Sequence, residues 1–182
     1  TEKRESDEAD DVPVDIIPSS LKSYDWKNRL AFRFTNKELD TEESTVTERT
    51  IGIQMHNALA EFKWVENWAE FKEDLEEKII DEDILNGLAE LCQSAEWKNW
   101  FTSPVNIWNE KHLLDSDGNE FIPDRVMEFE NEVIVVDYKA GSPNAKHPEQ
   151  VKNYISLLSD LFEKPVIGRL VYVKEGKMVE VD

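Results

Sequence analysis

Apolar and polar positions divide the chain into a helical first half and a second half dominated by short strands. Apolar residues recur at three- and four-residue spacing from Ile51 to Phe62, which predicts an amphipathic helix. The charged region at about 68–80 predicts a second helix. A third helix, ending near Trp97–Phe101 and before Pro104, is predicted from an apolar stripe made of Ile84, Leu88, Leu91 and Ala95.

Beyond Pro104 the pattern changes to short apolar runs that are typical of strands. These runs cover Val105–Trp108, Phe121–Phe129, Val133–Tyr138, Val166–Val173 and Met178–Val181. A helix at about 148–162 separates the third run from the fourth, and Glu175-Gly176-Lys177 predicts a hairpin turn between the last two. Helices, three strands, a helix and two more strands make an α/β domain.

The N-terminal part carries weaker signals. Residues 1–12 hold six acidic and two basic residues with almost no apolar content, which predicts a flexible acidic linker. We place the folded domain at 13–182, with short elements around Leu21–Trp26 and Leu30–Phe34 and a loop at Asp40–Arg49. Because residue 1 is Thr rather than Met, we expect the chain to be a segment of a longer polypeptide.

Composition limits the classes of function. The chain of 182 residues has 21 Lys and Arg against 40 Asp and Glu, a formal charge of −19, which argues against a nucleic-acid binder held by a broad basic surface. The single Cys92 excludes an intramolecular disulfide and fits a reducing cytoplasm. No apolar run is long enough for a membrane span. We expect a cytoplasmic protein without a membrane partner.

The most informative feature is a set of charges at the ends of two predicted strands. The apolar run 133–136 is followed by Asp137 and Lys139, which strand alternation places on one face, whereas Tyr138 projects oppositely. Such charges are costly at the end of a core strand unless they are paired or bind a metal. Asp124 precedes Asp137 by thirteen residues, a separation that a hairpin can close. Two carboxylates and a lysine suit a divalent ion and an activated water.

Four motifs, in order, resemble those of the RecB-like branch of the PD-(D/E)XK nuclease superfamily. They are Gly-Ile-Gln-Met-His-Asn-Ala-Leu at 52–59, Ile-Pro-Asp-Arg-Val at 122–126, Val-Asp-Tyr-Lys-Ala-Gly at 136–141 and Gln-Val-Lys-Asn-Tyr at 150–154. The resemblance covers about residues 50–175. Within the branch, the chain looks most like the C-terminal nuclease domain of an AddA-type or UvrD/RecB-like helicase–nuclease.

The resemblance implies a restriction-endonuclease-like core, with a central mixed β-sheet flanked by helices. It also implies a site for Mg²⁺ (or Mn²⁺) made of His56, Asp124, Asp137 and the backbone carbonyl of Tyr138. Oxygen ligands and a neutral imidazole are compatible with both ions. The structural alternative is that the two acids form salt bridges with Arg125 and Lys139.

The remaining implied site residues surround the lysine. Lys139 would orient the attacking water or offset charge on the scissile phosphate. Gln150 and Tyr154 are four residues apart and share a helix face, from which they would bind the DNA backbone or the lysine-bearing strand end. Alternatively, Tyr154 belongs only to the apolar stripe of its helix. Glu110 corresponds to an upstream glutamate of the family, although a solvated strand residue fits it nearly as well.

Other polar and aromatic residues are interpreted as surface or core residues without a role in the site. His112 and His147 lie outside every motif and are predicted to be surface residues. The six tryptophans are interpreted as mostly core, and Trp64, Trp68, Trp97 or Trp100 would qualify as base-stacking residues only if exposed.

The resemblance thus implies a metal-dependent deoxyribonuclease, expected to be an ATP-dependent exonuclease when joined to its helicase in double-strand break repair and recombination. Its partners would be DNA, the helicase region of the same polypeptide and a second helicase–nuclease subunit. The sequence leaves exonuclease and endonuclease modes open. The alternatives are a catalytically inactive docking or strand-guiding module, and a stand-alone exonuclease.

A prediction follows from the charge. The basic residues expected near the site are few, namely Arg125, Lys139, Lys146 and Lys152. The isolated chain should therefore bind DNA weakly and cleave it slowly unless a helicase holds the strand, because DNA affinity comes from clustered Lys and Arg. Binding and cleavage should be compared with those of the full-length protein at equal salt and Mg²⁺. Tight, metal-independent binding by the chain alone would contradict this expectation.

Overall fold

A computed structural model describes residues 46–182, which belong to one compact unit of the chain. Its elements are α2 (Val46–Glu61), α3 (Trp68–Lys78), α4 (Glu82–Leu91), α5 (Ala95–Thr102), β1 (Asn106–Asn109), β2 (Leu113–Leu114), β3 (Glu120–Phe121), β4 (Arg125–Glu128), β5 (Val133–Lys139), α6 (Lys146–Ser159), β6 (Val166–Tyr172), the 3₁₀ turn η3 (Val173–Glu175) and β7 (Lys177–Val181). The predicted linker at 1–12 and the elements predicted at 21–26 and 30–34 lie outside the described residues.

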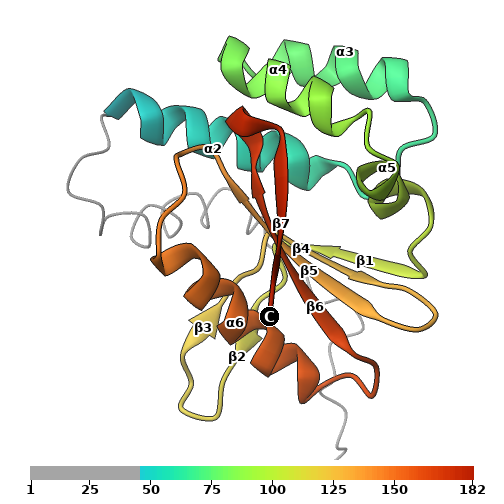
Figure 1. The fold of residues 1–182 in the computed structure, drawn as a ribbon, viewed down its shortest axis with the longest axis vertical. Coiled ribbons are helices and arrows are strands. Elements are labelled where there is room, and N and C mark those ends of the chain that lie inside the picture. The colour runs from blue at the N-terminus through green and yellow to red at the C-terminus, as the bar shows by residue number, and fades with distance from the viewer. Residues whose placement is uncertain (1–45) are drawn as a thin grey trace, which may run out of the picture. The chain divides into compact units, whose positions relative to one another are not determined.

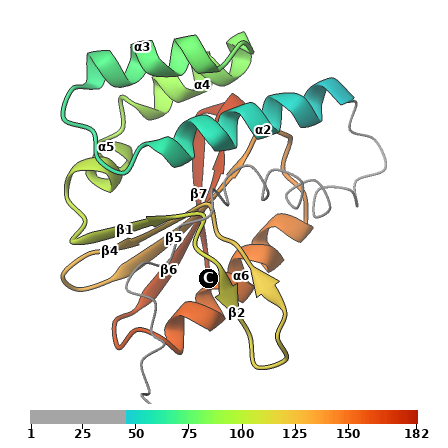
Figure 2. The ribbon, with the colours of Figure 1, turned by 180° about the vertical axis from the view of Figure 1, so that it is seen from behind.

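Five strands form one mixed sheet in the order β1-β4-β5-β6-β7. β5 and β6 are parallel and are connected through α6, whereas the other neighbouring strands are antiparallel. Helices α2–α5 cover one face of the sheet, and α6 lies on the other (Figures 1 and 2). The prediction of an α/β domain with a central mixed sheet flanked by helices is confirmed.

Alternation along β5 separates two hydrophobic cores. Ile134, Val136 and Tyr138 pack with α2–α5, whereas Val133 and Val135 pack with α6. This strand is buried on both faces, which explains why its sequence is a continuous apolar run rather than an alternating one. The same alternation directs the next odd-numbered positions of β5, 137 and 139, toward the α6 face.

The predicted third helix is in fact two helices, α4 and α5. Ser94 interrupts it: the Ser94 Oγ accepts a hydrogen bond from the Trp97 N–H at 3.4 Å and so begins a new helix. α4 begins in the same way, since Asp81 Oδ1 accepts from the Ile84 N–H at 3.0 Å. The loop predicted at Asp40–Arg49 is also wrong at its end, because α2 begins at Val46.

The strand predicted at Phe121–Phe129 is also divided. Its first residue, Phe121, belongs to β3, which pairs with β2 in a separate two-stranded sheet, and only Arg125–Glu128 join the main sheet as β4. Pro123 lies between the two strands and has no N–H to contribute to a ladder. Asp124 therefore occupies the short connection that leads into β4.

Gly87 allows α4 to approach the chain backbone at η3. A Cβ atom at Gly87 would lie only 1.7 Å from the Val173 carbonyl oxygen. Only a glycine fits between the helix and this carbonyl, so α4 is held against the end of β6 by direct backbone packing.

We expect Gly87→Ala to destabilise the fold by about 1–3 kcal/mol, although Ala has the higher helix propensity, because the methyl group would force the backbones apart. Gly141→Ala is the matched control, since a Cβ there meets nothing within 4 Å. Urea unfolding of both variants measures the difference. An unchanged midpoint for Gly87→Ala would contradict the close approach.

Candidate active site

The antiparallel pairing of β4 with β5 brings the two predicted acidic residues to one end of the sheet. Arg125 pairs with Val136 across the two strands, so Asp124 lies beside the end of β5 that carries Asp137. Asp124 Oδ2 accepts a hydrogen bond of 2.6 Å from the backbone N–H of Tyr138. This bond fixes the Asp124 carboxylate against the neighbouring strand.

His56 reaches the same carboxylate from α2. Its Nδ1 lies 3.1 Å from Asp124 Oδ1, and the two side chains are only 19% and 12% exposed. Burial alone would lower the pKa of His56, but the charge and hydrogen bond of Asp124 outweigh burial and raise this pKa to about 9. Burial acts to raise the pKa of Asp124, yet His56 holds it below its ordinary value. The two side chains therefore form an ion pair at neutral pH.

Asp137 and Lys139 form a second pair on the α6 side of β5. Lys139 Nζ lies 2.8 Å from Asp137 Oδ2, although this buried oxygen accepts no hydrogen bond of good geometry. The pKa of Asp137 is raised to about 6, chiefly by burial; Lys139 acts to lower it and Asp124 to raise it further. Asp137 is thus a buried carboxylate whose negative charge is incompletely compensated.

A chain of hydrogen bonds connects this pair to α6. Lys139 Nζ donates to Gln150 Oε1 at 3.0 Å, and Gln150 Nε2 lies 2.8 Å from the Tyr154 hydroxyl. The Tyr154 hydroxyl in turn donates to the Ile122 carbonyl at 3.2 Å. Because Ile122 lies two residues before Asp124, the chain ends beside the first carboxylate. Tyr154 is buried, and burial raises the pKa of its hydroxyl.

The structure therefore gathers every predicted site residue into one region. Its two sides meet at the ends of β4 and β5, with α2 contributing from one face of the sheet and α6 from the other. The residues are His56, Asp124, Asp137, Tyr138, Lys139, Gln150 and Tyr154.

Arg125 was predicted to lie near the site as a possible DNA contact, and this interpretation is wrong because its side chain is 1% exposed. Its guanidinium donates to the carbonyls of Phe62 at 2.7 Å, Lys63 at 2.8 Å and Trp100 at 2.9 Å. It also lies over the ring of Phe101, 4.2 Å from the centroid. The carbonyls belong to the C-terminal ends of α2 and α5, where helical partners are lacking and negative potential collects. Arg125 thus joins both helices to the strand that follows Asp124.

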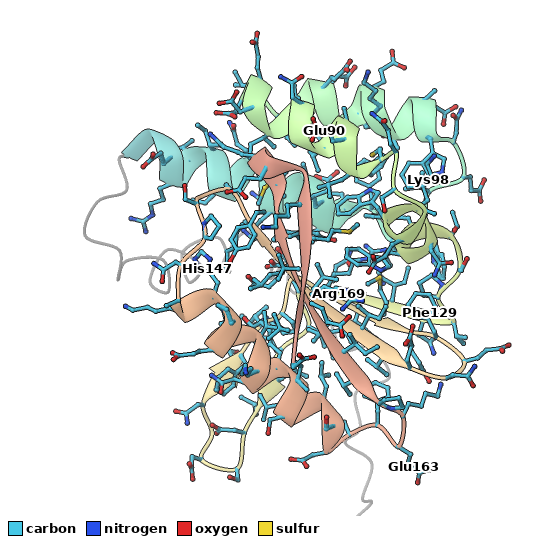
Figure 3. The ribbon with its side chains drawn as sticks, in the orientation of Figure 1. Glu90, Lys98, Phe129, His147, Glu163 and Arg169 are labelled. Carbon is cyan, nitrogen blue, oxygen red and sulfur yellow. The ribbon has the colours of Figure 1, made fainter. Side chains whose placement is uncertain are left out.

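The structure also locates Glu110 and the two remaining histidines. Glu110 directly follows β1 with φ of 50°, and its N–H donates to the Asp124 carbonyl at 3.0 Å. His112 pairs with Glu120 at 2.6 Å. His147, predicted to lie on the surface, is partly buried at the start of α6 (Figure 3), where burial and Lys139 lower its pKa to about 4. No motif signalled His147, because its burial depends on packing against the end of β6.

The chemistry of these donors suits a hard divalent cation, because carboxylate oxygens and one imidazole are ligands for Mg²⁺ and Mn²⁺. Within residues 46–182, however, no three His, Cys, Asp or Glu side chains are arranged so that they could hold a metal ion. Asp124 is engaged by His56 and the Tyr138 N–H, and Asp137 by Lys139. Metal binding would exchange these contacts, and the incompletely compensated charge of Asp137 favours that exchange.

No protein-family model matches this chain, and no curated protein matches it. The α/β architecture by itself accommodates many unrelated activities. Function is therefore inferred from the contacts of the site.

The His56–Asp124 pair predicts a pH dependence of stability. The pKa of His56 is about 9 in the folded chain against 6.5 for the ordinary group, so its stabilisation is complete below pH 6.5 and is lost as the pH rises through 9. The loss should be on the order of 3 kcal/mol. NMR titration of the His56 ring in EDTA measures the pKa directly. Asp124→Asn should lower the His56 pKa below 6.5, because burial and Lys139 then outweigh the remaining charge of Asp137. A wild-type pKa already below 6.5 would contradict the ion pair.

Arg125 predicts a second result. Arg125→Met should destabilise the fold by about 3 kcal/mol or more, because several buried carbonyls lose their donor, and should lower the His56 pKa by loosening α2. Arg169→Met is the matched control: Arg169 pairs with Glu96 and Glu180 but bonds no buried carbonyl among the described residues. Urea unfolding and the His56 titration provide the two readouts. Equal losses in both variants would contradict the role assigned to Arg125.

Proposed function

We propose that this chain is a deoxyribonuclease domain that depends on Mg²⁺ or Mn²⁺. The observation that supports this most strongly is the buried Asp137–Lys139 pair, which lies at a strand end beside Asp124 and His56. A carboxylate with incompletely compensated charge costs stability, so a functional use is its simplest explanation. The order of the four motifs supports phosphodiester hydrolysis as that use.

In this proposal Asp124, Asp137, His56 and the carbonyl of Tyr138 hold the metal. A bound divalent ion would offset negative charge on the scissile phosphate and lower the pKa of a water molecule. His56 is protonated at neutral pH and must lose its proton to become a ligand. Turning Asp124 away from His56 would remove the main cause of the raised pKa, so His56 would lose its proton more readily and could then serve as a ligand.

Lys139 performs the positioning step. With a cation held by Asp137, Lys139 could exchange part of its ion pair for the attacking water or the scissile phosphate. Gln150 continues to accept a hydrogen bond from Lys139, and Tyr154 orients the Gln150 amide. This support limits the motion of the ammonium group and keeps it directed toward the reacting phosphate.

The proposed substrate is DNA that the helicase region of the same polypeptide delivers during double-strand break repair or recombination. Cleavage would be exonucleolytic, and a second helicase–nuclease subunit would be a further partner. The net charge of −19 supports delivery of DNA by a helicase, because few basic residues near the site could bind DNA. Burial removes Arg125 from these residues. Lys146 and Lys152, on α6, are exposed and have no ion pair among the described residues. No helix of residues 46–182 is long and apolar enough to cross a membrane.

Asp137→Ala and Lys139→Ala should each reduce the cleavage rate of a labelled oligonucleotide at least 100-fold in Mg²⁺ or Mn²⁺, because the first removes a proposed metal ligand and the second the group that acts on the attacking water or the scissile phosphate. Lys98→Ala is a control for the loss of a lysine, since Lys98 is exposed on α5 (Figure 3). Asp137→Ala should not lower the melting temperature in EDTA, because it removes a buried carboxylate that Asp124 repels, while Lys139 keeps its hydrogen bond to Gln150. Full activity in Lys139→Ala would refute the role of this lysine, and a wild-type chain without cleavage would favour the inactive docking module.

A further inference from the structure

Trp64 differs from the tryptophans that form the core. It is 47% exposed and is the one aromatic residue among the exposed large apolar side chains of the described region, whereas Trp97 and Trp100 are fully buried. Within residues 46–182, no hydrogen bond, ion pair or ring contact involves Trp64. Trp64 therefore has the exposure that a tryptophan needs in order to stack on a base.

The backbone on both sides of Trp64 is held in place. The carbonyl of Lys63 accepts a hydrogen bond from Arg125 at 2.8 Å, and the N–H of Val65 donates to the Phe101 carbonyl at 3.1 Å. Val65 itself is buried in the core. An aromatic ring on such an ordered backbone loses little conformational freedom when a ligand stacks on it, and this favours binding.

This segment lies next to the connection that carries Asp124. The Asn109 side chain donates to the carbonyls of Ala60 at 2.7 Å and Phe62 at 3.1 Å, at the end of α2. The following residue, Glu110, donates its N–H to the carbonyl of Asp124. The segment that carries Trp64 therefore lies near the connection to Asp124, on the α2 side of the sheet.

The charged residues around Trp64 are only partly favourable for binding a polyanion. Lys63 and Lys111 are both exposed and have no ion pair among the described residues. Glu61 is neutralised by Lys78. Glu66 is exposed and opposes phosphate by its charge, so affinity has to come mainly from stacking and from Lys63.

We propose that Trp64 is a stacking platform for a base of single-stranded DNA on its way to the site, with Lys63 contacting the adjacent phosphate. This inference rests on the proposed nuclease function and adds a substrate class to it, because a paired base has no open face to offer. Stacking on an aromatic ring tolerates any base. A protein-docking surface would need a contiguous apolar patch, whereas the neighbours of Trp64 at 61, 63, 66 and 67 are polar and exposed.

The test is a thermodynamic cycle that needs no cleavage. Fluorescence anisotropy at low salt would measure the affinity of the Asp137→Ala chain, with and without Trp64→Ala, for labelled oligothymidylate and for an abasic strand of equal length. Trp64→Ala should weaken oligothymidylate binding roughly 5- to 100-fold and leave abasic binding unchanged. Trp64→Phe should retain most of the affinity. Lys63→Ala should weaken both ligands equally, and Leu161→Ala, an exposed apolar control, should change neither.

Two results would overturn the inference. The first is unchanged oligothymidylate binding by Trp64→Ala, which would favour a protein partner for this ring. The second is an equal loss of affinity for oligothymidylate and for the abasic strand. Absence of measurable oligothymidylate binding by the parent chain would overturn it as well. Failure of the nuclease proposal can be told apart from failure of this inference. It would appear as absence of metal-dependent cleavage by the wild-type chain, independently of the binding measurements on the Trp64 variants.

Discussion

The register between β4 and β5 is the constraint on which the candidate site depends. Pairing Arg125 with Val136 places Asp124 beside the end of β5, where the Tyr138 N–H fixes its carboxylate. A shift of one residue would reverse the face of every side chain in β4 and remove Arg125 from its carbonyls. The buried apolar residues of both strands oppose such a shift, so hydrophobic packing positions the charged groups.

Two buried charges of opposite character organise the region around this register. Arg125 is a cation whose terminal nitrogens donate to neutral carbonyls and whose guanidinium lies over an aromatic ring, although its Nε has no hydrogen-bond partner among the described residues. These contacts make it a structural group that holds α2 and α5. Asp137 is an acid whose raised pKa reflects incomplete compensation by Lys139. The first contributes to stability, and the second reduces it, a cost that the proposed function would explain by cation binding at Asp137. This contrast separates the scaffold of the site from its chemistry.

The sequence predicts the elements whose patterns are strong. β5 was found from its apolar run, and α6 from the helical spacing of Val151, Tyr154 and Leu158. The separate pairing of β2 with β3 was missed because two-residue strands are too short to show a period. The division of α4 from α5 was missed because a capping Ser94 lies within one apolar stripe.

Side-chain environments were harder to predict than elements. Alternation with the buried Met127 could have indicated that Arg125 faces the core, but adjacent acids suggested an ionic partner instead. The exposure of Trp64 depends on a segment held by contacts from Arg125 and α5, which no local pattern records. The acidic candidates could be expected to meet because Asp124 lies just before β4 and Asp137 near the end of β5, where antiparallel pairing determines proximity.

The most direct test of the account is where a divalent ion binds. A crystal soaked in Mn²⁺ and measured near the manganese absorption edge would locate the ion by its anomalous signal. The account predicts a peak about 2.0–2.4 Å from oxygens of Asp124 and Asp137, with the His56 ring turned from Asp124 to the metal and Lys139 still bonded to Gln150. No peak at these carboxylates, with manganese only on the exposed acids of α3, would contradict it.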